Sequence, residues 1–381
     1  MKTALFEYRM GSGWSVDSFP ELDAENTLVT VFGDRGFWED QAPFGELREA
    51  YPTAQIVGCS TAGEIHGRKL SDASLSVAVV SFDKTPIKTA VSSAAADDDS
   101  REVGRSLAER LDDERLSNVF VLSNGLNVNG TALVAGMNEV LDDAVKVTGG
   151  LAGDGEAFER TWVLYGDDVS LEQTVAVGFY GDDIVFTHGS QGGWDRFGPE
   201  RRVTKSEDNV LYELDDQPAL DLYKRYLGDH ADELPAAGLL FPLEIHEPAS
   251  PDKRLVRTIL AVDEADHSLT FAGDMPEGWT AQLMKANFDR LVDGAERAAE
   301  HSAGENIHQG PTVAFAISCV GRRLVLQERT EDEIEAVADL LPDGAGLVGF
   351  YSYGELSPHD AGEPCDLHNQ TMTLTVISER P

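Results

Sequence analysis

Apolar and polar positions along the chain follow two periods, so both strands and helices are predicted. Apolar runs bounded by turn residues predict strands at 27–32, 54–58, 74–82, 118–123, 161–165, 173–180, 184–188, 238–245, 255–263, 268–273, 312–319, 348–353 and 372–377. Apolar residues at helical spacing predict helices from Asp99 to about 111, and at 129–144, 218–227, 280–299 and 330–341. Residues 189–202 are rich in glycine and predict a loop. The pattern indicates a mixed α/β (α+β) fold with mixed and antiparallel sheets flanked by helices.

One turn motif occurs three times, at 56–64, 147–154 and 348–355, each time at the end of a predicted strand. Each copy has a glycine at the strand end, a few small or aromatic residues, and then a glycine followed by an acid. Glycine permits positive φ and lets backbone or ligand approach closely. We interpret the copies as corresponding corners of related half-structures around a pocket, which agrees with an internal duplication. The domain boundary is expected near residue 215, giving domains 1–215 and 216–381.

Two acid spacings predict helix N-termini of the capping-box type. Asp99 precedes Glu102 by three residues, and Thr330 precedes Glu333 by the same interval. In such a box the two side chains satisfy backbone N–H groups reciprocally.

The charge is unusual, because 30 basic residues stand against 68 acidic ones, for a net charge of −38. Such a surface repels phosphate backbones and anionic lipid, so binding to nucleic acid or to a membrane surface is disfavoured. The acids are scattered along the chain, which is typical of a protein kept soluble at high salt, and we hold that as a hypothesis about habitat.

Cysteine usage and hydropathy narrow the class further. The three cysteines, Cys59, Cys319 and Cys365, are far apart and form no C-x-x-C pair. Neither a disulfide framework, a zinc finger nor covalent c-type haem attachment is supported. The N-terminus lacks an apolar signal region, and no stretch approaches 18 apolar residues. We expect a cytoplasmic protein.

Several motifs in order resemble the FIST family. Residues 58–64 and 149–154 resemble its N-terminal domain, and residues 315–322, 349–355 and 367–371 resemble its C-terminal domain. The resemblance implies a non-catalytic prokaryotic sensory module of signal transduction that binds a small ligand, with amino acids the usual proposal. It also implies outputs such as the kinases of two-component systems, chemoreceptors or cyclic-dinucleotide enzymes. Because the chain ends soon after the last motif, we expect a signalling partner in trans; the oligomeric state is left open.

The candidate ligand residues follow from what an amino acid needs. Arg322 can bind a carboxylate through two parallel hydrogen bonds, and backbone N–H groups of the glycine turns can donate to the same carboxylate. The alternative role of Arg322 is a structural ion pair. An Arg322→Ala change is accordingly expected to abolish the ligand response and to leave the fold intact. Glu355 or Glu64 can accept the ammonium, or can instead accept turn N–H groups. The remaining candidates lie in or beside the motifs: Tyr351 or Tyr353 as an amphipathic wall, His368 and Asn369 as orienting groups, and Cys319, Ser60, Thr61, Gly150 and Asp154.

For several of these residues the structural alternative stays open. For Cys319, burial habit favours a small buried hydrophobe over a ligand contact. Asp154 is expected to pin its own turn, and His368 can be a satisfied strand-end side chain.

The same residues bear on other classes of function. Residues 58–62 resemble a G-x-S-x-G nucleophile elbow, but no helix pattern follows Ser60, so a serine hydrolase is disfavoured. Residues 150–155 lack the Lys-Ser/Thr of a phosphate cradle. Haem binding remains the stronger alternative, because some members of the family sense nitric oxide through haem and one axial histidine suffices. The haem candidates are His188, His246 and His368. A protein-interaction scaffold is the third possibility.

Overall fold

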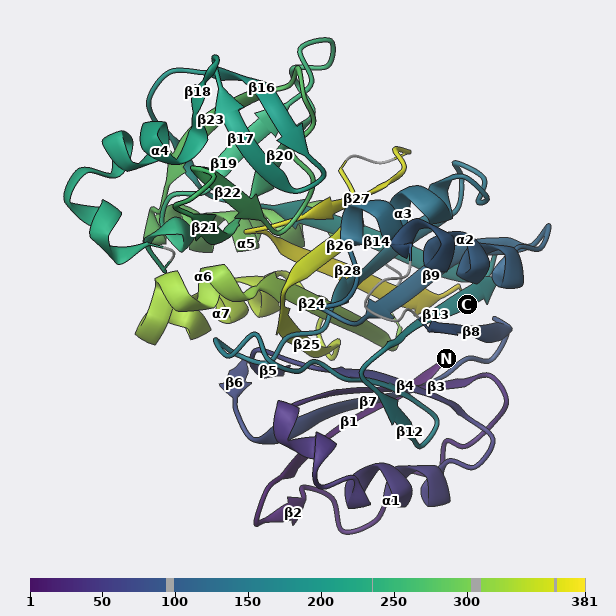
Figure 1. The fold of residues 1–381 in the computed structure, drawn as a ribbon. Coiled ribbons are helices and arrows are strands. Elements are labelled where there is room, and N and C mark those ends of the chain that lie inside the picture. The colour runs from purple at the N-terminus through teal and green to yellow at the C-terminus, as the bar shows by residue number, and fades with distance from the viewer. Residues whose placement is uncertain (94–98, 235, 303–309, 360–361, 381) are drawn as a thin grey trace.

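The computed structural model describes residues 1–93, 99–234, 236–302, 310–359 and 362–380. These residues form a core of three sheets and a separate nine-stranded sheet inserted into the third part of the core (Figure 1). The fold is mixed α/β, with parallel and antiparallel pairs in the same sheets and a two-domain arrangement, as the hydrophobic pattern predicts.

The first unit of the core defines a pattern of four adjacent strands and one exported hairpin. Its sheet runs in the order β4-β3-β7-β1, with β3 parallel to β4 and antiparallel to β7. The elements are β1 (Lys2–Arg9), β2 (Gly13–Trp14), β3 (Thr27–Gly33), η1 (Arg35–Trp38), α1 (Ala42–Ala50), β4 (Gln55–Ser60), β5 (Glu64–His66), β6 (Lys69–Ser71) and β7 (Ser74–Ser81).

The second and third units repeat this strand order, as β10-β9-β13-β8 and β25-β24-β28-β14. The second unit consists of β8 (Ile87–Ser93), α2 (Ser100–Leu111), β9 (Leu116–Ser123), α3 (Gly130–Asn138), β10 (Lys146–Leu151), β11 (Val163–Tyr165), β12 (Asp168–Ser170) and β13 (Gln173–Tyr180). The third consists of β14 (Ile184–Gln191), α5 (Phe288–Ser302), β24 (Thr312–Cys319), α6 (Val320–Leu326), η4 (Gln327–Arg329), α7 (Thr330–Leu340), β25 (Gly346–Ser352), β26 (Gly354–Pro358), β27 (Cys365–His368) and β28 (Met372–Glu379).

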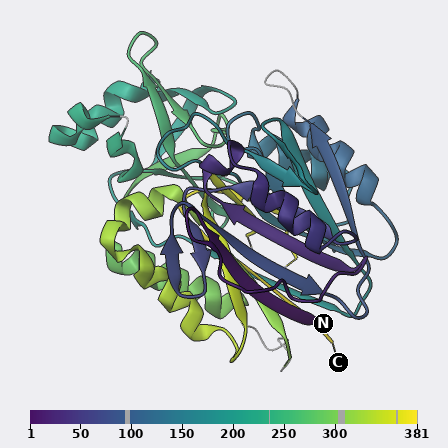
Figure 2. The same ribbon diagram turned by 90° about the horizontal axis from the view of Figure 1, so that it is seen from below.

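Each unit gives its hairpin to another unit, and the exchange closes in a ring. Hairpin β5–β6 of the first unit pairs with β25 of the third, β11–β12 of the second pairs with β4 of the first, and β26–β27 of the third pairs with β10 of the second. The chain termini also meet, since the Met1 ammonium lies 3.1 Å from a Glu379 carboxylate oxygen (Figure 2). The core is therefore built from three related units, which corrects the expectation of two related halves.

The three copies of the turn motif meet where the units exchange strands. Backbone hydrogen bonds connect each pair of copies. Ala62 N donates to Tyr351 O at 2.8 Å, Gly153 N to Ser60 O at 3.0 Å and Tyr353 N to Leu151 O at 3.2 Å. Aromatic side chains fill the space between the sheets, because Phe315 of the third unit contacts both Phe32 of the first and Phe120 of the second. Figure 1 shows the helices of each unit at the periphery of the core.

The inserted domain occupies the chain between β14 and α5. Its elements are β15 (Asp195–Arg196), β16 (Arg201–Glu207), β17 (Val210–Leu214), β18 (Gln217–Pro218), α4 (Ala219–Leu227), η2 (Gly228–Glu233), η3 (Ala236–Leu239), β19 (Leu243–His246), β20 (Arg254–Arg257), β21 (Ile259–Asp263), β22 (Ser268–Phe271) and β23 (Thr280–Lys285). Residue 215 lies inside this domain, between β17 and β18, so the expected boundary near 215 does not separate two sheets.

Several predicted elements differ in the structure. The strand predicted over 255–263 is divided into β20 and β21, and the strand predicted over 238–245 begins only at Leu243, after η3. The helix predicted over 280–299 is strand β23 followed by α5, because residues 280–285 pair with β16 and β19. The helix predicted over 129–144 ends at Asn138, and Asp142 turns the chain by accepting the N–H of Ala144. The loop predicted over 189–202 begins and ends in strands, since β14 continues to Gln191 and β16 starts at Arg201.

The two expected capping boxes have different outcomes. Asp99 is the N-cap of α2 and accepts the backbone N–H of Arg101 at 2.9 Å. The box at Thr330 is wrong, because the Thr330 hydroxyl donates to the carbonyl of Gln327 and Glu333 points into the interior.

Candidate functional site

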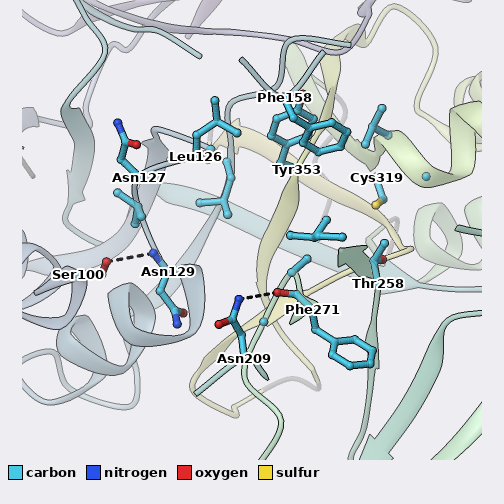
Figure 3. Close-up of a pocket in the computed structure, with 18 of the residues that line it drawn as sticks. Ser100, Leu126, Asn127, Asn129, Phe158, Asn209, Thr258, Phe271, Cys319 and Tyr353 are labelled. Atoms are coloured by element: carbon cyan, nitrogen blue, oxygen red, sulfur yellow. Dashed lines mark hydrogen bonds between the residues drawn. The ribbon is translucent and has the colours of Figure 1, made fainter. Parts of the chain in front are cut away.

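A cavity of about 410 Å³ lies between the core and the inserted domain (Figure 3). The core contributes the loop 125–129, residues 319–321 and the side chains of Leu151, Phe158 and Tyr353. The inserted domain contributes Asn209, Leu239 and residues of β21, β22 and their flanking segments. Residues of the core and of the inserted domain thus form one pocket.

The rim of the cavity is apolar and exposed. Leu126, Phe158 and Leu260 line it and are 37%, 43% and 41% exposed, and all three are among the most exposed large hydrophobic residues described. Phe158 stacks on Tyr353 with the ring centroids 4.5 Å apart and the planes inclined by 11° (Figure 3). An exposed apolar rim around a pocket is typical of a surface that is covered on binding.

The second motif positions this aromatic pair. Asp154 accepts the backbone N–H groups of Phe158, Glu159 and Arg160 at 2.8–2.9 Å, which fixes the turn carrying Phe158. The Tyr353 hydroxyl of the third motif donates to the same carboxylate. Burial and this carboxylate raise the pKa of Tyr353, so its hydroxyl stays protonated. Phe158 has φ +51°, a left-handed conformation that costs a non-glycine residue free energy.

Neutral polar side chains form the remaining walls. The Asn129 side chain donates to Asp274 across the domain interface at 2.8 Å, and its backbone N–H donates to Ser100 Oγ at 3.0 Å. Asn209 donates its Nδ2 to the carbonyl of Phe271 at 2.7 Å, which leaves its Oδ1 without an intramolecular bond among the described residues. Thr258 is buried in the wall, and its hydroxyl has no partner in the described part of the chain.

Cys319 ends strand β24 and lines the cavity. Burial raises the pKa of its thiol, with the Glu355 carboxyl adding to the shift, so the thiol is protonated at neutral pH. A protonated thiol is a poor nucleophile and a poor metal ligand. Cys319 therefore serves the cavity as a small wall residue.

Arg322 does not face the cavity, which corrects the expectation that it binds a ligand carboxylate. Its guanidinium is fully buried and forms an ion pair with Glu333, Nη2 to Oε2 at 2.6 Å. The same guanidinium donates to the backbone carbonyls of Gly192 and Leu291, both at 2.7 Å. Tyr351 is fully buried beside this pair and donates its hydroxyl to Glu333 Oε1 at 2.7 Å.

Glu64 and Glu355 occupy equivalent positions in the first and third units and hold their own turns. Glu64 accepts from Thr61, three residues earlier, and from the N–H and hydroxyl of Ser74. Glu355 repeats this arrangement with the hydroxyl of Ser352 and the N–H and hydroxyl of Thr371. Burial raises the pKa of each carboxyl to about 8. Both bind the following strand instead of a ligand ammonium, which corrects the expected role.

Two further candidates from the turn motifs have structural roles. The Ser60 hydroxyl accepts the N–H of Trp162 at 2.9 Å, which ties β4 to the segment before β11. A Cβ added to Gly150 would lie 2.8 Å from Ile317 Cγ2, so this glycine allows two units to approach closely.

The histidines expected to orient a ligand or hold haem lie outside the cavity. His368 borders a separate cleft of about 190 Å³, donates Nε2 to the carbonyl of Ser357 at 2.9 Å, and has its pKa lowered by burial to about 4. Asn369 is fully buried and donates its Nδ2 to the carbonyl of His368. His188 lies on β14 and His246 on β19, where His246 Nδ1 faces the carbonyl of Glu247.

The cavity between the core and the inserted domain has no histidine among its described lining residues that could serve as an axial haem ligand. None of His188, His246 and His368 is among the described residues lining the larger cavity, and the 190 Å³ cleft is far below the 300–1,000 Å³ of usual ligand pockets. Within the described ranges, no group of three or more His, Cys, Asp or Glu side chains is arranged to hold a metal ion. No helix in the described part of the chain is long and apolar enough to span a membrane.

Two residues predicted from the sequence, Cys319 and Tyr353, line the cavity, and the predicted Asp154 lies behind its wall. The lining residues Phe158, Asn209 and Thr258 were not predicted. Phe158 follows Asp154 by four residues, so the second motif was the available signal for it. Asn209 and Thr258 come from the inserted domain, where no motif marks them.

Two family models match most of the chain. The family model described as FIST N domain matches residues 27–217, and that described as FIST C domain matches residues 219–358. An uncharacterized protein of Methanocaldococcus jannaschii is 24% identical over 393 residues, covering 88% of this chain and 70% of that protein. Among solved structures, the cyanuric acid hydrolase from A. caulinodans aligns with a TM-score of 0.36 and 9% identity over 93% of this chain and 90% of that chain.

Proposed function

The chain belongs to the FIST family, whose domains are sensory domains of signal transduction, and we propose that it senses a small ligand held in the cavity between the core and the inserted domain. The observation that carries the proposal is the position of the cavity. Its walls come from both the core and the inserted domain, so a ligand that contacts both changes the free energy of their association. A sensor requires a ligand that binds one arrangement of the two parts more tightly than another.

The dimensions and surface of the cavity support this proposal. A volume of about 410 Å³ falls within the usual range for small-molecule pockets. The exposed apolar rim of Leu126, Phe158 and Leu260 gains from being covered by a ligand. Asp154 holds the Phe158–Tyr353 pair in place, so part of the binding surface is formed in advance.

An amino acid, the ligand class implied by the family resemblance, would bind here without the two charged partners expected for it. Arg322 is paired with Glu333, and Glu355 is bound to Ser352 and Thr371. The carboxylate and ammonium of an amino acid would then be desolvated against neutral groups, which costs free energy. Amino acids therefore belong in the test as the contrasting class.

The proposed role includes no catalysis. The Cys319 thiol is protonated, and the described lining holds no histidine that would serve it as a base. The output is proposed to pass in trans to a kinase, chemoreceptor or cyclic-dinucleotide enzyme. Ligand-dependent association with such a protein would support this part of the proposal.

A thermal-shift screen at molar salt, with amino acids and uncharged metabolites, tests the proposal. A ligand present at about 100 times its Kd should stabilise the fold by about 2.7 kcal/mol. Hydrogen exchange then locates each hit, and protection at both 125–129 and 271–273 is the expected result. Hits that protect other surfaces, or a screen without hits, would count against the cavity as the sensing site.

A further inference from the structure

The cavity has a chemical preference that follows from its unsatisfied polar groups. We infer that it takes an uncharged ligand with an amide-type edge, a hydrogen-bond donor beside an acceptor, and that Thr258 is the residue that selects for it. This inference rests on the proposed function, because it names the ligand class of the same cavity.

The first observation is an unpaired hydroxyl in the cavity wall. Thr258 lines the cavity and is buried, and its Oγ1 has no hydrogen-bond partner in the described residues. A buried hydroxyl without a partner loses the hydrogen bonds that it makes in water, so such a group beside a pocket indicates a partner that arrives with the ligand. Rotation about the Cα–Cβ bond exchanges the hydroxyl and the methyl group between staggered positions, which lets Thr258 present its hydroxyl to the cavity.

The second observation is an unpaired carboxamide behind the cavity wall. The Gln370 side chain is fully buried, and neither Nε2 nor Oε1 has a hydrogen-bond partner in the part of the chain that the structure describes. The carboxamide lies directly behind the cavity wall, because a Cβ added to the wall residue Gly321 would be 2.5 Å from Nε2. Gln370 also has φ +63°, a strained conformation of the kind that concentrates at functional sites. A hydrogen-bond donor and an acceptor without partners in the described residues therefore lie behind Gly321, which lines the same cavity as Thr258.

The charge of the lining is the third observation. The residues described as lining the cavity include no Asp, Glu, Lys, Arg or His. One buried cation, Arg257, lies behind Gly273, and its Nε donates to the carbonyl of Asp274 at 3.0 Å. The carboxylates of Asp274 and Asp366 act on Arg257 electrostatically and offset its charge. A charged ligand would lose its hydration without gaining a counter-ion, whereas a neutral one would not.

These observations together define the ligand. The apolar body lies against the Phe158–Tyr353 pair and the aliphatic rim, and the polar edge lies toward Thr258 and Gly321. An amide edge suits a threonine hydroxyl and a carboxamide, because each of these groups both donates and accepts. The free Oδ1 of Asn209 adds an acceptor for a ligand N–H.

Four probes that share one ring separate the charge classes: benzamide, benzoate, benzylamine and L-phenylalanine. Each is titrated into the full chain at molar salt by ligand-observed NMR, together with every hit from the metabolite screen. The expected result is that benzamide binds at least about tenfold more tightly than benzoate, benzylamine or phenylalanine, since burial of an unpaired charge is costly.

Two substitutions at Thr258 and one control isolate the hydroxyl. Thr258→Val should weaken benzamide by about three- to tenfold, the loss of one hydrogen bond, while Thr258→Ser should restore it. Thr30→Val is the control, because Thr30 Oγ1 is also buried without a described partner but lies outside the cavity. Both valine variants should melt at or above the temperature of the parent, since each removes an idle buried hydroxyl.

The outcomes separate this inference from the proposed function. Tighter binding of a charged probe or a charged hit, or an affinity unchanged by Thr258→Val, would overturn the amide-class inference and leave the cavity as a sensing site. If benzamide fails and an uncharged hit binds and is weakened by Thr258→Val, the inference stands on that hit. Absence of binding by all probes and all screened metabolites would overturn both.

Discussion

Arg322 and Glu333 form an ion pair in the interior of the third unit, with Nη2 and Oε2 2.6 Å apart and both side chains fully buried. The pair also fixes its surroundings, since Glu333 accepts from Ser318 and Tyr351, and Arg322 donates to the chain on both sides of the inserted domain, at Gly192 and Leu291. An arginine in a motif that resembles a ligand site is here the anchor of the domain junction.

Removing one partner of this pair should cost far more stability than removing both. Arg322→Ala should destabilise the fold by about 3–5 kcal/mol, because it leaves the Glu333 carboxylate buried and unpaired. The double variant Arg322→Met with Glu333→Leu should lose clearly less. Urea denaturation monitored by circular dichroism measures both. Single and double variants with the same loss would contradict a paired interior charge.

Stability should fall as the pH rises from about 4.5 to about 8. Glu64 and Glu355 have folded pKa values of about 8, above their ordinary value of 4.5, because both are buried. The contribution of the two carboxyls to the free energy of unfolding is complete below the unfolded pKa and is lost as the pH rises through the folded pKa. Between these values the free energy of unfolding falls by roughly 1.4 kcal/mol per pH unit for each carboxyl. Glu379, whose pKa is lowered to about 2, acts only at lower pH.

The control for this pH dependence is Glu64→Gln. The amide oxygen can still accept from Ser74, and the NH2 group can donate to the Thr61 hydroxyl, but the amide does not titrate. The slope of unfolding free energy against pH should therefore decrease by the share of one carboxyl. Urea titrations at several pH values provide the slope. An identical slope in the variant would show that Glu64 does not titrate in this window.

Gly149 tests the close approach of neighbouring strands in the second unit. Its φ is +148°, and an added Cβ would lie 1.9 Å from the carbonyl oxygen of Val121. Gly149→Ala should therefore destabilise by more than about 3 kcal/mol. Gly155→Ala is the matched control, because Gly155 has φ +76° and open space around the added Cβ, and should cost only about 1–2 kcal/mol. Equal losses of melting temperature would contradict the packing argument.

Salt should stabilise the protein. A net charge of −38 repels itself in the compact state, and ions screen this repulsion with a Debye length of about 3 Å at 1 M. The melting temperature should rise between low salt and molar potassium chloride. A flat or falling curve would exclude electrostatic repulsion as a limit on stability.

The sequence predicted local features better than partners. The strands at 74–82, 173–180 and 312–319 were found because their apolar runs are continuous and bounded by turns. The exchange of hairpins between the three units was not predicted, because β5 pairs with β25 across nearly three hundred residues and no local pattern encodes which strand is the partner. Glycine and acid spacing found the turns, yet the acids Glu64 and Glu355 hold backbone groups of their own units.

The residues of the cavity were likewise predicted only where a local motif marks them. Tyr353 and Cys319 lie in motifs and were found, whereas Thr258 and Asn209 lie in the inserted domain and become part of the site only when that domain docks on the core.

The measurement that tests the central claim most directly is ligand binding to a variant whose cavity mouth is narrowed. Leu126 lines the mouth and is partly exposed, so Leu126→Trp adds bulk there without disturbing the interior, and Met10→Trp is the control at an equally exposed position away from the cavity. Calorimetric titration of the tightest screening hit should show at least about tenfold weaker binding to Leu126→Trp and unchanged binding to Met10→Trp. Equal affinity for both variants and the parent would contradict a sensor whose ligand occupies this cavity.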